Sequence, residues 1–351
     1  MTHITKPRVR HPGLPTNDLG LTRRDYEGRM STLCAGCGHD SITAAIIQAA
    51  WGMNLEPHRV AKLSGIGCSS KTPTYFLGEA HGFNSVHGRM PAIATGAQVA
   101  HPELTYIGVS GDGDSLSIGL GQLCHAVRRN VNMLYVLENN GVYGLTKGQF
   151  SASAERGSKT KRGLTNEMSP IDPILLALSL GATFVARSFS GDKGQLVPIL
   201  QAAIRHKGFA LIDVISPCVA FNDHEGSTKS YSFTRNHLAE AIEADLVLPM
   251  AEITTSYDPG TARVVKLPDG SSLRFRKIPD DYDPQNRGQV YRYVRERQDE
   301  GEIPTGILYV EPDAPDHVGA LGTVDDNLVD LPFEDLCPGS AKLDEVLAGY
   351  R

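Results

Sequence analysis

The sequence predicts an α/β protein built on a doubly wound, mostly parallel β-sheet with a C-terminal extension. Between about residues 30 and 220, short β-branched apolar stretches alternate with longer stretches of helical periodicity. Glycine-rich turns interrupt this pattern, which is typical of sheets that bind ligands at their carboxyl edge. A chain of 351 residues with 40% hydrophobic residues can bury the core of one large domain plus an appendage.

The expected elements of this domain follow in order. Two apolar segments come first and can be core elements, and a strand–helix–strand unit comes next. A helix, a strand, a second helix and a second strand complete the sheet. In chain order the segments are 44–53, 59–64, 104–110 (strand), 115–129 (helix), 131–137 (strand), 172–182 (helix), 183–189 (strand), 194–206 (helix) and 209–216 (strand). No internal repeat follows, so we expect a single α/β unit.

The last third of the chain has a different character. We expect a helix near His237 to Leu246, a hairpin over 262–278 with Asp269-Gly270 at its turn, a charged helix over 289–300 and a strand over 306–313. The expected domains are an N-terminal arm (1–29), the main domain (30–225), an extension (226–313) and an acidic, peripheral or flexible tail (314–351). We expect the extension to pack on the main domain or to hold a partner.

The Gly-Asp-Gly motif around Asp112 and the Asn-Asn pair ending in Asn140 lie at the two ends of the strand–helix–strand unit, with 25 residues between them. Parallel strands place both at the carboxyl edge of the sheet. Mg²⁺ prefers hard oxygen ligands, which Asp112, the Asn140 side chain and the Val142 carbonyl can supply. Gly111 and Gly113 allow the backbone to approach a diphosphate at the start of a helix.

This spacing resembles the signature of proteins that bind thiamine diphosphate with Mg²⁺. Asp114, Gly144 and Leu145 lie in the same loops and are expected to line the cofactor. The alternative is that the motif contains only turn and helix-cap residues and binds no ligand.

Four of the six cysteines, Cys34, Cys37, Cys68 and Cys218, lie in glycine- or proline-rich turns. Free backbone amides in such turns can hydrogen-bond sulfur, which suits thiolate ligands. Zinc and an iron–sulfur cluster both fit this spacing. Alternatively, Cys68 and Cys218 are small buried core residues. A disulfide framework is disfavoured in a reducing compartment.

Five motifs in one order resemble the thiamine-binding β subunits of 2-oxoacid:ferredoxin oxidoreductases, over roughly residues 30–225. They are CAGCGHD, GIGCSS, HGRMPAIATGAQVA, the GDGD to NN segment and GVYGLTKGQFSAS. The resemblance implies thiamine diphosphate, Mg²⁺ and one 4Fe-4S cluster, with Cys34, Cys37, Cys68 and Cys218 as cluster ligands. Ala35 replaces a proline that is common in the first motif, which affects only the rigidity of that loop.

The implied activity is the oxidative decarboxylation of a 2-oxoacid with CoA to an acyl-CoA and CO₂, with electrons passing through the cluster to ferredoxin. Thiamine enzymes also need a glutamate from a second domain. Since only one α/β unit is present, the resemblance implies an α subunit that completes the site, in an αβ or (αβ)₂ assembly.

Four more residues near the motifs are candidates for the site. Lys71 matches a basic position directed at the substrate, and Lys147 lies in a loop that can close over substrate or CoA phosphates. His87 and His39 can hydrogen-bond the diphosphate or act near the cluster. The alternative is that the lysines are ordinary solvent-exposed residues and that the histidines have only a structural role.

Lys71 and the CAGCGHD and CSSKTP variants favour 2-oxoglutarate as the substrate, because a lysine suits a second carboxylate. Pyruvate and indolepyruvate are alternative substrates. Two different functions compete with this one: a thiamine-dependent decarboxylase or synthase subunit without electron transfer, and a scaffold with a structural zinc.

Net charge and hydropathy limit the partners and the cellular location that we expect for the protein. The net charge of -6 and the pI near 6.1 argue against a nucleic-acid partner. No apolar run approaches the length of a membrane span, and the first residues lack the apolar core of a signal peptide. We therefore expect a cytoplasmic enzyme with no membrane contact.

Overall fold

The computed structural model describes residues 11–239, 282–324 and 326–350, and the backbone of three strands between 243 and 276. Within these residues, seven strands form the main sheet in the order β12-β7-β8-β4-β3-β1-β2. Their bounds are β1 Val60–Ser64, β2 His81–Asn84, β3 Thr105–Gly111, β4 Met133–Asn139, β7 Phe184–Phe189, β8 Phe209–Ile215 and β12 Gly306–Val310.

All neighbouring strands from β2 to β7 are parallel, and β12 joins the edge of the sheet antiparallel to β7. The mostly parallel sheet expected from the sequence is therefore confirmed. The short edge strand β2 was not expected, because its four residues HGFN are exposed and carry no apolar pattern.

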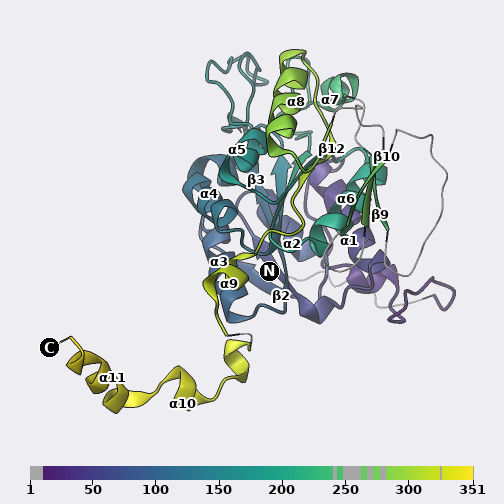
Figure 1. Cartoon of the computed structure of the whole chain (residues 1–351). Coiled ribbons are helices and arrows are strands. Elements are labelled where there is room, and N and C mark those ends of the chain that lie inside the picture. Colours follow the sequence, from purple (N-terminus) through teal and green to yellow (C-terminus); the bar gives the residue numbers. More distant parts are fainter. Residues whose placement is uncertain are drawn as a thin grey trace.

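Helices cover both faces of the sheet (Figure 1). On one face α1 (Gly38–Gly52) packs against α6 (Lys193–Arg205). On the other, α3 (Met90–Ala100), α4 (Leu120–Arg128) and α5 (Pro173–Leu180) lie in a row, and α8 (Arg287–Asp299) packs against α5. The sheet is thus doubly wound.

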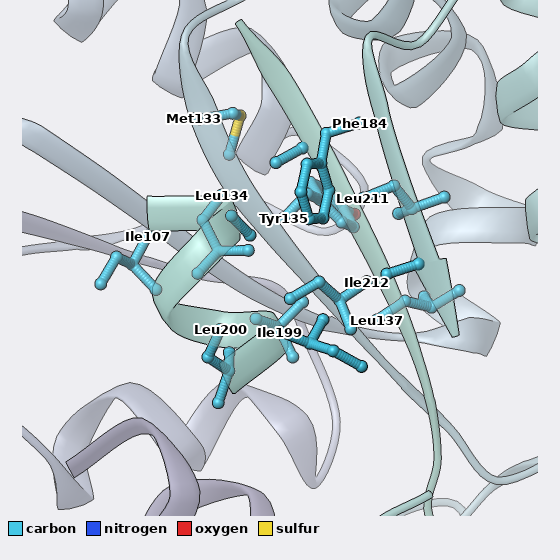
Figure 2. Packing of buried hydrophobic residues seen from close by; sticks show 14 of the residues in the cluster. Ile107, Met133, Leu134, Tyr135, Leu137, Phe184, Ile199, Leu200, Leu211 and Ile212 are labelled. Atoms are coloured by element: carbon cyan, nitrogen blue, oxygen red, sulfur yellow. The ribbon is translucent and has the colours of Figure 1, made fainter. Parts of the chain in front are cut away.

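The core lies between the central strands and these helices. Figure 2 shows side chains of β3, β4, β7 and β8 meeting those of α6. Each of these strands is buried on both sides, which explains why their sequences are nearly continuous apolar runs. A rigid sheet of this kind fixes the loops at its carboxyl edge.

The helix expected over 115–129 is divided in the structure. A π-helical turn, Asp114–Ile118, comes before α4, and the Gly119 amide bonds the Asp114 carbonyl at 2.7 Å. Such turns occur often at functional sites. Here the turn follows directly on the Gly-Asp-Gly motif.

One prediction for the C-terminal third is wrong. The helix expected near His237 to Leu246 is instead α7 (Tyr231–His237), and strand β9 (Glu243–Val247) follows. Ser230 starts the helix early by accepting the Phe233 amide. The next segment pairs with a neighbouring strand, and this tertiary pairing overrides local helix preference.

The other C-terminal elements match expectation. Strands β10 (Ala262–Lys266) and β11 (Ser272–Arg276) form the antiparallel hairpin, and β11 also pairs with β9. The Asp269-Gly270 turn lies outside the described residues. Helix α8 and strand β12 occupy the segments expected for a helix and a strand, and β12 extends the main sheet.

The tail contains α9 (His317–Leu321), α10 (Phe333–Leu336) and α11 (Gly339–Ala348). From α10 on, it leads away from the body of the molecule, and nearly all its side chains are exposed (Figure 1). Within the part of the chain that the structure describes, no helix is both long and apolar enough to cross a membrane.

Candidate active site

Asp112 directly follows β3 and is 1% exposed. Its hydrogen bonds converge on Oδ2, which accepts the Gly141 amide at 2.8 Å and the Ser153 hydroxyl at 2.6 Å, and also the Ser151 hydroxyl. Burial raises the pKa of Asp112, while these donors and the Asn140 amide oppose the rise. One oxygen of a buried carboxylate is thus fixed by protein donors.

Asn140 lies at the start of the loop after β4, beside Asp112. Its Oδ1 accepts the Val142 amide at 3.0 Å, and its own carbonyl accepts Nδ2 of Asn222 at 2.8 Å. Gly141, at φ +75°, makes the turn that brings its amide to Asp112. The structure therefore brings together the acid and amide that the sequence paired.

The two glycines of the motif allow close approach. A Cβ on Gly113 would lie 2.5 Å from the Tyr143 ring, whose hydroxyl donates to the Gly113 carbonyl. A Cβ on Gly111 would lie 3.0 Å from Oγ of Ser69. In both cases the space is taken by protein side chains.

Asp114 is also buried, but its carboxylate faces protein groups. Oδ1 accepts the Gly88 amide at 2.7 Å, and Oδ2 accepts the Ser110 hydroxyl at 2.7 Å. These bonds tie the loop before α3 to the end of β3. His87 precedes Gly88 in the loop before α3, and its side chain is exposed.

The four cysteines gather at the same edge of the sheet. Cys34 and Cys37 lie in the turn before α1, Cys68 follows β1 and Cys218 follows β8. A Cβ on Gly144 would lie 3.4 Å from the Cys68 sulfur and 3.7 Å from that of Cys218. The loop after Asn140 therefore runs directly beside two of these thiols.

Electrostatic coupling joins the four thiols. Burial raises the pKa of Cys68, and the Cys218 and Cys34 thiols add to the rise, while the Lys71 ammonium lowers it. Burial likewise raises the pKa of Cys37 to about 12. Among the described residues, no three His, Cys, Asp or Glu side chains are grouped to hold a metal ion.

Burial also raises the pKa of Cys218, and the nearby backbone amides of Phe221, Ala220 and Asn222 oppose the rise. The Phe221 and Asn222 amides donate to the Cys218 carbonyl. Cys124 lies in α4, away from the four, and Cys337 lies in the exposed tail.

His39 is completely surrounded by protein. Its Nδ1 lies 2.7 Å from the Ser216 hydroxyl, and its Nε2 lies 3.6 Å from Oε2 of Glu138. Burial lowers the pKa of His39 to about 4 and raises that of Glu138 well above its usual range. Thr72 donates its hydroxyl to Glu138. His39, Ser216 and Thr72 lie next to the cysteine loops in the chain, and their contacts help to hold those loops in place.

The two lysines lie in two different loops, one in the turn that carries Cys68 and the other three residues after Gly144. Lys71 is partly buried in the short turn after Cys68. Lys147 is exposed and has φ +80°, a backbone conformation that is uncommon outside glycine and often found at functional sites. Leu145, in the same loop, is 56% exposed.

Sequence reasoning missed Ser151 and Ser153, which anchor Asp112, and Tyr143, which covers Gly113. The serines occupy alternate positions in the FSAS segment that ends the last of the five motifs. That alternation, next to a proposed carboxylate ligand, was the available signal.

Known proteins with similar sequences and folds point to one family. Residues 65–214 match the family model described as thiamine pyrophosphate enzyme, C-terminal TPP binding domain. The 2-oxoglutarate oxidoreductase subunit KorB of Mycobacterium tuberculosis is 41% identical over 222 residues, 63% of this chain and 59% of the relative. The 2-oxoacid:ferredoxin oxidoreductase subunit beta of Saccharolobus solfataricus is 46% identical over 199 residues, 56% of this chain and 65% of the relative. The chain thus spans about three fifths of these relatives' length.

A solved structure resembles the fold more extensively. It is a 2-oxoglutarate:ferredoxin oxidoreductase from Magnetococcus marinus, with 2-oxoglutarate, coenzyme A and succinyl-CoA bound. The TM-score is 0.70 at 32% identity, over 86% of this chain and 89% of the other. The chain therefore belongs to the family of 2-oxoacid:ferredoxin oxidoreductase β subunits and contains its thiamine diphosphate-binding domain.

Proposed function

We propose that this chain is the β subunit of an enzyme that oxidatively decarboxylates 2-oxoglutarate with CoA and passes the electrons through a 4Fe-4S cluster to ferredoxin. The observation that carries the proposal is the meeting of two sites at one sheet edge. The loop after β4 touches Asp112 through Gly141 and lies beside Cys68 and Cys218 through Gly144.

The donor set near Asp112 fits Mg²⁺ with a diphosphate. Protein donors saturate Oδ2, so Oδ1 is the oxygen that would bind the ion. The Asn140 side chain and the Val142 carbonyl would add two neutral oxygens, a hard-oxygen set that Mg²⁺ prefers. When bound, thiamine diphosphate supplies the carbanion that adds to the 2-oxo carbon.

The four thiols are the ligand number and type that a 4Fe-4S cluster takes. They come from three loops at one sheet edge, and Cys68 is coupled electrostatically to Cys218 and Cys34. Gly144 has no side chain to fill the space beside two of the sulfurs, and a bound metal would deprotonate the thiols.

Two lysines support the choice of substrate. The Lys71 ammonium is close enough to Cys68 to lower the pKa of that thiol, and from this position it can pair with a distal carboxylate. Lys147, exposed in the loop after β4, would hold anionic groups of substrate or CoA. The Magnetococcus marinus relative is described with 2-oxoglutarate and coenzyme A bound, which supports the same choice.

The edge of this site has apolar side chains suited to a partner. Val86, Ile118 and Leu145 are 71%, 48% and 56% exposed and lie in segments that carry site residues. Isolated exposed apolar residues are common, but three around one site favour an interface. An α subunit covering them would complete the active site in an αβ or (αβ)₂ assembly, which we place in the cytoplasm.

The decisive experiment is anaerobic turnover of the two co-expressed subunits with 2-oxoglutarate, pyruvate and indolepyruvate, with CoA and oxidised ferredoxin. We expect the largest kcat/KM for 2-oxoglutarate. A preference for another 2-oxoacid would overturn the substrate assignment. Decarboxylation without ferredoxin reduction by an iron-free protein would favour a non-redox thiamine enzyme instead.

A further inference from the structure

A row of buried side chains leads from Asp112 across the sheet. The Ser153 hydroxyl lies between Oδ2 of Asp112 at 2.6 Å and Oδ1 of Asn139 at 2.8 Å. Nδ2 of Asn139 donates to Oδ1 of Asp213 at 2.9 Å. Asn139 therefore connects the loop that holds the carboxylate to the neighbouring strand β8.

An ion pair anchors the far end of this row. Arg187 on β7 lies opposite Asp213 in the sheet and donates Nε to its Oδ2 at 2.7 Å. It also donates to Asp172, which accepts Nε2 of Gln298 from α8 at 2.6 Å. Buried charges are stable only when paired, so Asp213 is held in one position.

This anchoring fixes which way the Asn139 amide points. Asp213 is paired with Arg187 as a carboxylate and can only accept, so the amide nitrogen of Asn139 must face it. The amide oxygen must then face Ser153. That oxygen and Oδ2 of Asp112 compete for the single Ser153 hydroxyl hydrogen, and the Ser153 oxygen is held between them.

We propose that Asn139, oriented by the Asp213–Arg187 pair, is a positioning residue for the metal site, acting through Ser153 on the carboxylate of Asp112. The residue is 1% exposed, so these protein contacts alone determine its orientation. The inference rests on the proposed role of Asp112 as a Mg²⁺ ligand. Groups that orient a metal ligand typically change metal affinity 10- to 100-fold when removed.

The test measures Mg²⁺ affinity by titration calorimetry, with saturating thiamine diphosphate, on the co-purified subunits after removal of both cofactors. Asn139→Leu, of similar size, should weaken Mg²⁺ binding about 10- to 100-fold. Thr183→Val is the matched control, because it removes buried hydrogen bonds to Asn130 and His206 just before the strand that carries Arg187. The control should lower the Tm but leave Mg²⁺ affinity unchanged.

Exchanging the amide and the carboxylate between positions 139 and 213 distinguishes a positioning role from general damage to the fold. Asn139→Asp alone sets two carboxylates against each other and should weaken Mg²⁺ binding. Combined with Asp213→Asn, it restores a donor and an acceptor in reversed order, and Arg187 still has an oxygen to bind. The double variant should recover most of the affinity lost by Asn139→Asp.

Wild-type Mg²⁺ affinity in folded Asn139→Leu or Asn139→Asp, or no recovery in the double variant, would overturn the inference. The Asp112→Ala variant separates this failure from a failure of the proposed function. If Asp112→Ala binds Mg²⁺ normally, the metal site itself is wrongly assigned. If it loses Mg²⁺ while the Asn139 variants do not, only the positioning role fails.

Discussion

The Gly141 amide donates a 2.8 Å hydrogen bond to Oδ2 of Asp112, and so joins the loop after β4 to the loop after β3. The bond needs the positive φ of Gly141, because only that turn aims the amide back at the carboxylate. A Cβ at this position would also lie 2.9 Å from the side-chain nitrogen, Nδ2, of Asn222. The acid and amide of the motif are thus held together before any ion binds.

Asp112→Ala should abolish Mg²⁺-dependent binding of thiamine diphosphate, because it removes the only charged oxygen ligand of the proposed site. Calorimetry with and without Mg²⁺ measures the loss, and circular dichroism checks that the variant is folded. Asp112→Asn, which keeps the shape and loses the charge, should weaken binding less. Unchanged cofactor affinity in folded Asp112→Ala would refute the assignment.

Replacing Cys34, Cys37, Cys68 or Cys218 by Ser should lower iron content and stop electron transfer to ferredoxin, since each is a proposed cluster ligand. Metal analysis after anaerobic purification and ferredoxin reduction measure both effects. Cys124→Ser and Cys337→Ser are the controls, because those thiols lie apart from the four. One zinc and no iron per wild-type chain would contradict the prediction.

Lys71→Met should reduce kcat/KM for 2-oxoglutarate about ten- to a hundredfold, because a charge-assisted contact is worth roughly 1.5–3 kcal/mol. Pyruvate lacks the distal carboxylate and serves as the internal control, so its kcat/KM should be spared. The ratio of the two specificity constants isolates the contact from damage to the Cys68 turn. Equal losses on both substrates would show that Lys71 does not recognise the distal carboxylate.

Acid should destabilise the fold between pH 6.5 and 4 in part through His206. Burial lowers the pKa of this histidine to about 4, against 6.5 in the unfolded chain. As pH falls through this window, the unfolded chain takes up a proton that the folded chain does not. The contribution of His206 to the free energy of unfolding should therefore be complete above pH 6.5. The free energy of unfolding should fall by about 3 kcal/mol from there towards pH 4.

His206→Asn should make the unfolding free energy depend less steeply on pH, which urea denaturation at several pH values between 7 and 4 measures. His39, whose pKa burial also lowers to about 4, contributes a slope of the same sign in this variant. His58→Asn, at an exposed position, is the control and should leave the slope as in the wild type. Identical slopes for wild type and His206→Asn would contradict the assignment.

The central sheet and the Asp112–Asn140 pair could be predicted because both depend on local pattern. Apolar runs identify buried strands, and parallel strands bring their ends to one edge. The helix expected up to Leu246 failed because β9 forms only by pairing with β11, a contact that lies outside its own segment. The positioning role of Asn139, a member of the Asn-Asn pair, was not predicted for the same reason, since its partners Ser153 and Asp213 are distant in sequence.

The tail has a consequence for the colloidal behaviour of the protein. Residues 314–351 contain eight acidic and two basic residues, so they carry the whole net charge of -6 and leave the other 313 residues with none. Proteins near zero net charge repel one another least and precipitate most readily. A chain truncated after Asp313, which keeps β12 and removes the projecting helices, should therefore be less soluble near pH 7, even though its sheet is complete.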